Sequence, residues 1–350
     1  MVTHKNTKQV SVGNVLVGGG APVSVQSMLN VEAHDVEGNV KQALALQAAG
    51  CEILRVSVPD KETIQTVAAL KETLQIPLVA DIHFDWRLAI ESAAVGVDKI
   101  RINPGNIGED EHVRAVANVC REKKIPIRIG VNSGSIEKQI LAKYGSPTPE
   151  AMVESGLYHI SLLEKFDFED IVLSLKSSDV GRMYEAYVRA AEVCPYPLHV
   201  GVTEAGTLQS GTLKSAAGVG GLLLRGIGDT IRISLTDDPV KEVETGLQLL
   251  KALGLRKGGV KFVSCPTCGR TKIDLISIAQ EAERRLSSLD RDITVAVMGC
   301  VVNGPGEARE ADFGIAGGDG CGVVFRHGEI IRKVEEAKLL DALMEEIQKN

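Results

Sequence analysis

Three cysteines toward the C-terminal end have the spacing of a redox metal site. Cys265 and Cys268 form a Cys-x2-Cys pair, and Cys300 follows the apolar run Ile293–Val297. A Cys-x2-Cys turn presents two thiolates on one side of a tight loop, and a strand end can bring a third beside them. Zinc or an iron–sulfur cluster can use such ligands. A structural zinc site usually takes a second close pair of Cys or His, which Cys300 lacks, so the spacing favours the cluster.

The composition is that of an ordinary intracellular protein. A chain of 350 residues suggests about two domains, and 44% apolar with 24% charged residues suits a soluble core and surface. No run approaches the ~20 apolar residues of a membrane span, and the polar start has no signal-peptide core. Seven cysteines, an odd number, favour a reducing compartment over a disulfide framework. We therefore expect a cytoplasmic protein with no membrane partner.

The charge balance argues against a nucleic-acid partner. The net charge is -7, and aromatic residues make up 3% of the chain. A polynucleotide needs a basic surface, and single strands also need aromatic stacking platforms. We expect no nucleic acid among the partners.

Short β-branched runs alternate with amphipathic helical segments through the first part of the chain. Alternating strands and helices predict parallel strands joined by right-handed crossovers. Eight such units in about 250 residues predict an α/β fold of the (β/α)8 TIM-like barrel type, with an open doubly wound sheet as the alternative. The eight runs are Val23–Gln26, Ile53–Val58, Leu78–Ile82, Lys99–Ile102, Ile127–Val131, Ile171–Leu175, Leu198–Val202 and Ile231–Leu235.

Two further segments belong to this barrel. The alternating segment Val10–Val17, broken by Gly13 and Asn14, predicts a hairpin that plugs the barrel floor. Residues 133–149 form an insertion after the fifth strand.

Polar side chains interrupt these runs late in each strand or directly after it. Because the carboxyl ends of parallel barrel strands share one rim, such side chains should converge on a single mouth. The residues are Gln26, Ser27, Asn30, Arg55, Asp81, His83, Arg101, Asn103, Arg128, Asn132, Lys176, Glu204, Arg232 and Ser234.

Five of these side chains are cations: Arg55, Arg101, Arg128, Lys176 and Arg232. Burying so much positive charge without an anion is costly, because each ion loses its hydration. Guanidinium groups match phosphate oxygens in a bidentate manner, so a phosphorylated or diphosphate-bearing small molecule is the leading substrate class. The alternative is that acids such as Asp81 and Glu204 neutralise the arginines in polar layers of the barrel.

The chain divides into a barrel domain, 1–254, that binds substrate and a C-terminal domain, 260–350, that holds the metal cluster. In the second domain the sequence predicts two strands and two helices. They are the helix Thr271–Leu286, the strands Ile293–Val297 and Val323–Phe325, and the closing helix Glu335–Ile347.

The linker between the domains predicts a shared active site. The helix Pro239–Leu253 runs back about 22 Å toward the barrel floor, away from the mouth. The segment Gly254–Gly259 extends only about 20 Å, too little to climb the wall and cross the top. We therefore expect a head-to-tail homodimer, in which the barrel of one subunit works with the C-terminal domain of the other.

Several longer motifs resemble a known family. Together with both cysteine motifs, they resemble the bacterial 4-hydroxy-3-methylbut-2-enyl diphosphate synthases of the non-mevalonate isoprenoid pathway, from about Val10 to about Val334. One departure is Leu29-Asn30-Val31, where threonines flank the asparagine in the family. The motifs span residues 25–28, 80–85, 101–108, 203–206 and 228–232.

The resemblance implies a [4Fe–4S] cluster held by Cys265, Cys268 and Cys300, with the Glu307 carboxylate as fourth ligand. A carboxylate is a harder and more labile ligand than thiolate, so one iron can exchange it for a substrate oxygen. Cys321 is the rival fourth ligand and has no assigned role. The electron donor implied is a ferredoxin or a flavodoxin.

The resemblance also implies a reaction and roles for the mouth residues. The substrate is 2-C-methyl-D-erythritol 2,4-cyclodiphosphate, which two electrons open with loss of water to a linear allylic diphosphate. In this scheme the five cations hold the diphosphate and Glu204 handles a proton near the departing hydroxyl. The residues expected to orient the substrate are Asp81, His83, Asn103, Asn132 and Ser234.

Two other functions compete with this one. A non-redox lyase or aldolase acting on a sugar phosphate would use zinc as a structural ligand of the small domain. A non-enzymatic electron-transfer or iron-sensing module would use the barrel only to bind a regulatory phosphate ester. Iron and sulfide in an anaerobic preparation separate the cluster from zinc.

Overall fold

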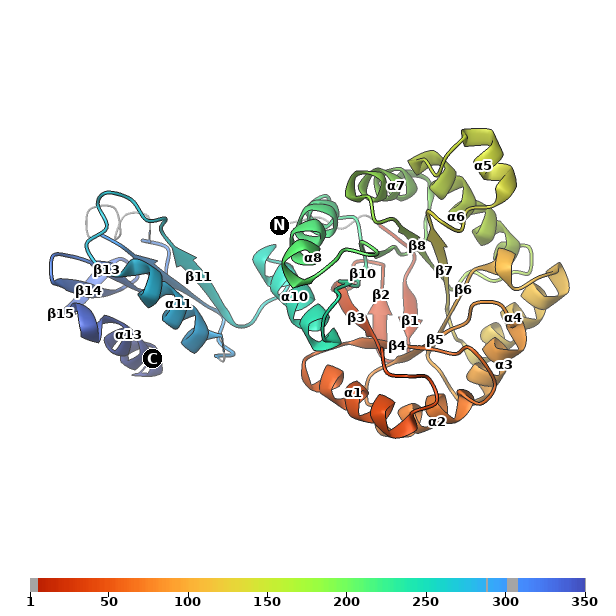
Figure 1. The fold of residues 1–350 in the computed structure, drawn as a ribbon, viewed down its shortest axis with the longest axis horizontal. Coiled ribbons are helices and arrows are strands. Elements are labelled where there is room, and N and C mark those ends of the chain that lie inside the picture. The colour runs from red at the N-terminus through yellow and green to blue at the C-terminus, as the bar shows by residue number, and fades with distance from the viewer. Residues whose placement is uncertain (1–5, 288, 301–307, 350) are drawn as a thin grey trace. The chain divides into compact units, whose positions relative to one another are not determined.

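The computed structural model describes residues 6–287, 289–300 and 308–349 (Figure 1). Contacts within the chain divide it into two units, Met1–Leu255 and Arg256–Asn350. Each has its own hydrophobic core.

The first unit is a parallel (β/α)8 barrel, so the predicted fold class is confirmed. The strand order is β8-β7-β6-β5-β4-β3-β10-β9, and a parallel bridge between Leu173 and Leu198 brings β8 against the chain leading into β9. The strands are β3 (Ser24–Met28), β4 (Ile53–Ser57), β5 (Leu78–Asp81), β6 (Lys99–Ile102), β7 (Ile127–Asn132), β8 (Ile171–Lys176), β9 (His199–Val200) and β10 (Thr230–Ile231).

Helices surround the barrel (Figure 1). Aspartates fix where several of them begin: the Asp35 carboxylate accepts from Gly38 N at 2.9 Å, and that of Asp179 accepts from Arg182 N at 2.7 Å. The helices are α1 (Val36–Ala48), α2 (Ile64–Thr73), α3 (Trp86–Ala94), η1 (Pro104–Asn106), α4 (Asp110–Lys123), α5 (Lys138–Tyr144), α6 (Pro149–Glu164), α7 (Val180–Val193), α8 (Leu208–Ser215), η2 (Ala216–Gly220), α9 (Gly221–Leu224) and α10 (Pro239–Ala252). The insertion predicted at residues 133–149 contains α5.

A hairpin closes the amino-terminal end of the barrel strands, as predicted. Strands β1 (Val10–Val12) and β2 (Val15–Val17) pair antiparallel across Gly13, whose φ of 55° suits glycine in this turn. Val12 and Val17 form a small buried cluster with Ile53 and Val79, which lie near the start of their strands. Ligands must therefore enter the barrel from the opposite end.

The inside of this barrel is polar, whereas the usual interior of the fold is a packed apolar core. Lys99 of β6 donates across the barrel to Gln26 of β3, which is not a neighbouring strand. Arg128 donates to Ser174 at 2.8 Å, and both side chains are buried. Successive residues of a strand point to opposite faces of the sheet. The apolar residues next to these inward-facing polar residues therefore point outward, toward the helices. The interior is thus built to hold polar groups.

The second unit is a five-stranded mixed sheet with helices packed on it (Figure 1). Its first three strands run parallel and its last two antiparallel. The elements are β11 (Val260–Ser264), α11 (Leu275–Leu286), β12 (Ile293–Met298), β13 (Phe313–Gly317), β14 (Cys321–Arg326), β15 (Glu329–Glu335), η3 (Glu336–Lys338) and α13 (Leu339–Lys349).

The sequence prediction for this unit was incomplete. It missed β11, β13 and β15, and it started the closing helix at Glu335, whereas α13 begins at Leu339. Strand β15 is an edge strand with a largely exposed, charged sequence, and β13 includes Gly314 and Gly317. Neither has the apolar alternation that marks a strand.

Across the part of the chain that the structure describes, none of the helices combines the length and apolar character that a bilayer crossing needs.

Candidate active site

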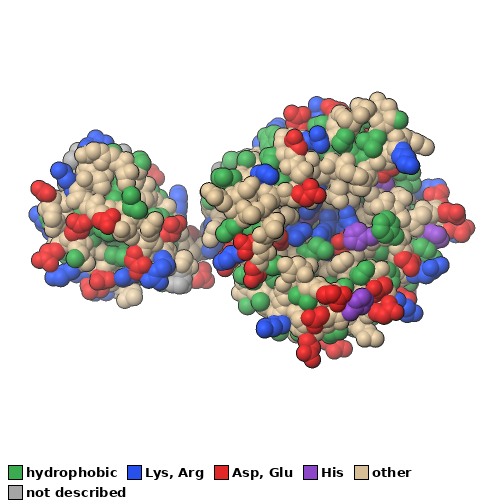
Figure 2. Space-filling model, in the orientation of Figure 1, with side chains coloured by type: hydrophobic (Ala, Val, Ile, Leu, Met, Phe, Trp, Pro, Cys, Tyr) green, Lys and Arg blue, Asp and Glu red, His purple; other side chains and the backbone are tan. Residues whose placement is uncertain are grey.

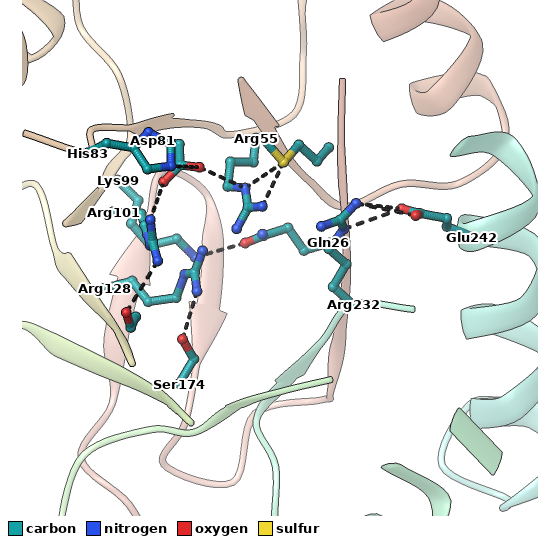
Figure 3. Close-up of polar contacts among 12 residues, drawn as sticks. Gln26, Arg55, Asp81, His83, Lys99, Arg101, Arg128, Ser174, Arg232 and Glu242 are labelled. Carbon is teal, nitrogen blue, oxygen red and sulfur yellow. Dashed lines mark hydrogen bonds and ion pairs between the residues drawn. The ribbon is translucent and has the colours of Figure 1, made fainter. Parts of the chain in front are cut away.

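A buried carboxylate organises one side of the barrel mouth (Figure 3). Asp81 ends β5 and is 2% exposed. Its oxygens lie 3.1 Å from Arg101 Nη1, 3.7 Å from Arg55 Nε and 3.8 Å from His83 Nε2. Burial alone would raise the pKa of the Asp81 carboxyl, but the two guanidinium groups outweigh it and lower the pKa to about 2. Asp81 is therefore ionised and holds both arginines in place.

A second carboxylate holds Arg232. Glu242, in the first turn of α10, is 4% exposed and lies 3.2 Å from Arg232 Nη2. It also accepts from Ser27 Oγ at 3.1 Å and from Leu235 N at 3.0 Å. A carboxylate with this many hydrogen-bond donors is held in one position. Glu242 therefore orients the guanidinium of Arg232.

The positive charges of Arg55 and Lys176 are only partly compensated, because Arg55 shares Asp81 with Arg101 and, among the described residues, Lys176 has no ion pair. The nitrogens of Arg55 donate to the thioether of Met28, which is a weak acceptor. Burial first, and then repulsion from Arg232 and Arg101, lowers the pKa of Arg55 to about 10. Burial, followed by repulsion from Arg128 and Arg232, likewise lowers the pKa of Lys176. An anion at the mouth would relieve both penalties.

Arg128 lies deeper than the sequence suggested. It is the second residue of β7 and is 1% exposed, so it does not lie on the rim. The stagger of the strands pairs it in register with Arg101. Its Nε and Nη2 atoms are buried and have no hydrogen-bond partner. Figure 2 shows the resulting patch of basic side chains at the bottom of a hollow in the barrel face.

The other predicted residues lie at strand ends or just beyond them, and within the described residues none of them forms a side-chain hydrogen bond or ion pair with the five cations. Asn103 caps η1 by accepting from Gly105 N at 3.2 Å, and Asn132 pairs in register with Lys176. Ser234 follows β10 and is half-buried. Glu204 lies exposed in the loop after β9, and among the described residues no cation forms an ion pair with it. The alternative that Glu204 neutralises the mouth arginines is therefore not what this structure shows.

Sequence reasoning missed two charged residues of the site. Glu242 belongs to a helix ten positions beyond Arg232, where strand patterns give no signal. Lys99 is the first residue of β6, so the rule of strand ends did not select it. It nevertheless lies on the same strand face as Arg101 and Asn103, because side chains alternate with a period of two. That spacing was a usable signal for Lys99.

The close approach of β7 to Arg101 gives a testable prediction. A Cβ added at Gly130 would lie 2.5 Å from Arg101 Nε and 2.7 Å from Nη2. Gly130→Ala should therefore leave the fold intact but displace this guanidinium from Asp81. Losing one charged hydrogen-bonding group costs about 1.5–3 kcal/mol, so we expect the dissociation constant for an anionic ligand to rise about 10- to 100-fold.

The matched control is Gly134→Ala, in the loop after the same strand. No atom lies within 4 Å of a Cβ built there. Calorimetric titration of both variants with the diphosphate substrate proposed below measures the effect. Equal affinity of the two variants would contradict the importance of the position of Arg101.

The cysteines lie at one edge of the second sheet. Cys265 directly follows β11 and Cys300 lies just beyond β12, and these strands are parallel neighbours. Cys265 Sγ accepts from Gly299 N at 3.1 Å, and Lys272 N donates to Gly299 O at 3.0 Å. Hydrogen bonds from the backbone, and then the side chain, of Arg270 lower the pKa of the exposed Cys268 thiol. Arg270 therefore favours the thiolate form of Cys268.

The donor set fits an iron–sulfur cluster in its chemistry. All three thiols are free, and soft thiolates are the ligands such clusters take. Within the described ranges, no three His, Cys, Asp or Glu side chains are gathered closely enough to hold a metal ion. The expected fourth ligand, Glu307, lies outside the described residues. Cys321 begins β14 at the same edge of the sheet and is free.

A parallel barrel with cations gathered inside its carboxyl end is the architecture of an enzyme that binds an anionic small molecule. The chain belongs to the GcpE family: residues 7–247 match the GcpE TIM-barrel domain and residues 261–349 match the GcpE protein C-terminal domain.

Close relatives extend over almost the whole chain. A protein of Caldanaerobacter subterraneus is 58% identical over 99% of this chain and 98% of its own length. One of Clostridium perfringens is 58% identical over 99% of each chain. Both are named 4-hydroxy-3-methylbut-2-en-1-yl diphosphate synthase (flavodoxin), so the resemblance seen in the sequence motifs is confirmed.

More distant solved structures share the barrel alone. Dihydropteroate synthase from Stenotrophomonas maltophilia is 15% identical, with a TM-score of 0.53 over 71% of this chain and 97% of that one. 3-Dehydroquinate dehydratase from Geobacillus kaustophilus is 14% identical, with a TM-score of 0.52 over 71% and 99%. At this identity the likeness concerns the fold only.

Proposed function

We propose that this chain reduces 2-C-methyl-D-erythritol 2,4-cyclodiphosphate to 4-hydroxy-3-methylbut-2-en-1-yl diphosphate. The bond from a ring carbon to a phosphate oxygen and the bond from the neighbouring carbon to its hydroxyl break, a carbon–carbon double bond forms, and water leaves. Two electrons and one proton convert the substrate dianion to the product trianion. The names of relatives 58% identical over nearly the whole chain support this assignment.

The observation that carries the proposal is the excess of positive charge inside the mouth. Among the described residues, only Asp81 and Glu242 form ion pairs with the five cations. A diphosphate supplies the missing negative charge and accepts bidentate hydrogen bonds from guanidinium groups. Anaerobic incubation with the cyclic diphosphate and a strong reductant tests the proposal through formation of the linear product.

In this proposal each group at the mouth has a role. Arg55, Arg101, Arg128, Lys176 and Arg232 hold the diphosphate, and Asp81 keeps two of these arginines aimed at it. His83, Asn103, Asn132 and Ser234 orient the carbon skeleton and its hydroxyl groups. Glu204, exposed on the loop after β9, gives a proton to the departing hydroxyl.

The second unit would hold the redox group. Cys265, Cys268 and Cys300 would ligate three irons of a [4Fe–4S] cluster, and Glu307 the fourth. Such a cluster would supply single-electron chemistry to the site. We propose a flavodoxin as the donor, since the relatives are named for it, with a ferredoxin as the alternative. Free cysteines throughout the described chain suit a reducing cytoplasm, where we place the protein.

We further propose a homodimer whose active sites each combine the barrel of one subunit with the cluster unit of the other. The support is the length of the linker. Helix α10 ends at Ala252 and β11 begins at Val260, so the connecting segment is short. About 20 Å of extended chain is too little to climb a barrel wall and cross its top.

Mixing two inactive variants tests the shared site. Cys268→Ala removes a cluster ligand, and Arg232→Met removes a mouth cation from an otherwise intact chain. After mixing and subunit exchange, random pairing gives heterodimers in about half of the dimers, each with one site that has both functional halves. We expect about a quarter of the wild-type activity in an anaerobic assay. A mixture as inactive as its two components would contradict the shared site.

A further inference from the structure

Beneath the mouth lies a second layer of buried polar side chains that the proposed chemistry does not use. Lys99 and His199 are 0% exposed and Gln26 is 1% exposed. Within the described part of the chain, Lys99 has one hydrogen bond, from Nζ to Gln26 Oε1 at 3.4 Å, and it is longer than a good hydrogen bond. Gln26 Nε2 and both ring nitrogens of His199 are buried without partners. Figure 3 shows Lys99 with Gln26 as its partner. This layer therefore does not stabilise a charge on Lys99.

The charges around Lys99 are nearly all positive. Arg128 and Arg55 repel it, whereas Asp81 on the neighbouring strand β5 is already shared by Arg101 and Arg55. Burial first, and then repulsion from Arg128 and Arg55, lowers the pKa of Lys99 far below its usual value. The charged and titratable groups that line the barrel from the other strands are Arg55, Asp81, Arg101, Arg128, Lys176, His199 and Arg232.

Burial, and then repulsion from Arg128, lowers the pKa of His199 as well. His199 is thus neutral at physiological pH and adds no charge to the layer. No carboxylate of the described residues forms an ion pair with Lys99. The negative charge that balances an ammonium there must therefore come from a ligand. Our proposed substrate brings two such charges to the arginines directly above.

We propose that the Lys99 amine is uncharged in the ligand-free barrel and takes up one proton from solution when a diphosphate dianion binds at the mouth. Lys99 is then a positioning residue of the diphosphate site. It adds a cation beneath the ligand and acts through Arg128 and Gln26, not by touching the substrate. This inference rests on the proposed substrate.

Proton linkage makes the idea measurable. A ligand that binds the protonated form more tightly takes up protons, and its dissociation constant rises as pH rises. Between the pKa of Lys99 in the free protein and its higher pKa in the complex, one proton of uptake corresponds to a tenfold change per pH unit. The cyclic diphosphate has only strongly acidic protons, so it stays a dianion near neutral pH and does not contribute to this count.

The experiment is calorimetric titration of the full-length protein with the cyclic diphosphate, near pH 8, in buffers of different ionisation enthalpy. The slope of heat against ionisation enthalpy counts the protons. Lys176 is also buried with a lowered pKa, so wild-type uptake includes its share. The difference between wild type and Lys99→Met isolates Lys99: we expect the variant to take up one proton fewer. The pH dependence of its dissociation constant should be shallower by the same amount.

Two control variants and one stability measurement make the result decisive. Lys251→Met, an exposed lysine of α10, should match wild type in proton count. The Lys99→Met variant should fold normally. Its unfolding temperature should equal or exceed that of wild type, because the substitution removes a buried amine that has no anionic partner. Lys99→Gln provides a second neutral side chain that should behave as the methionine does. A merely structural lysine would not change the proton count.

The outcomes separate this inference from the proposed function. Binding with equal proton uptake by wild type and both Lys99 variants would overturn the role of Lys99 and leave the proposed function intact. No binding of the cyclic diphosphate to wild type would overturn both.

Discussion

Replacing Cys265 with serine should empty the iron–sulfur site and abolish turnover. Serine is a poor ligand for iron, and Cys265 Sγ lies against the backbone of Gly299, next to Cys300. Iron and sulfide should fall from about four each per chain to near zero in anaerobic preparations. The affinity for the cyclic diphosphate should stay close to wild type, because the cations that bind it belong to the barrel unit.

Two further variants sharpen this prediction. Cys321→Ala changes a free cysteine at the same sheet edge and should retain iron, sulfide and activity. Glu307→Ala should lower the iron content if that carboxylate is the fourth ligand. Loss of the cluster from Cys321→Ala alone would instead assign the fourth position to Cys321. Wild-type protein that is colourless and holds one zinc would contradict the cluster and favour the lyase alternative.

Replacing Glu204 with glutamine should lower kcat by about 10²- to 10⁴-fold, the usual contribution of a positioned proton donor. Glu204 follows β9, at the end of the barrel where the cations gather, and its side chain is exposed to incoming ligand. Its φ of 52° is a left-handed conformation that costs energy in residues other than glycine. Strained backbone of this kind clusters at functional sites, which supports a role for this side chain.

Steady-state assays of Glu204→Gln should show the loss in kcat with little change in KM or in iron content. Glutamine keeps the size and the backbone preference of the side chain and removes only its ability to transfer a proton. Glu192→Gln, an exposed carboxylate of α7, is the matched control and should show wild-type rates. Near-normal turnover of Glu204→Gln would remove Glu204 from the chemistry.

The barrel could be predicted from the sequence because its strands have a strong apolar pattern. The prediction failed mainly in length: β9 and β10 contain two residues each, whereas five were expected in each run. Gly201 explains part of this. A Cβ there would lie 2.5 Å from the carbonyl oxygen of Arg232, so the two segments approach more closely than side chains permit.

The mouth could be predicted where its residues lie at the carboxyl ends of the barrel strands, because these ends share one rim. This rule located Arg55, Asp81 and Arg101, which the structure brings into contact. It could not find Glu242, which reaches the site from a helix, because no local pattern links a helix residue to a distant strand end. The fourth cluster ligand, the dimer and the roles of the individual mouth residues stay predictions.

The central claim is that a diphosphate held by the barrel receives two electrons through an iron–sulfur cluster. The most direct measurement is anaerobic turnover of the wild-type protein with the cyclic diphosphate and a titrated one-electron reductant. We expect the linear allylic diphosphate as product, with two equivalents of reductant consumed for each molecule formed. Iron- and sulfide-replete protein that binds the cyclic diphosphate and accepts electrons, but forms no linear product, would contradict it.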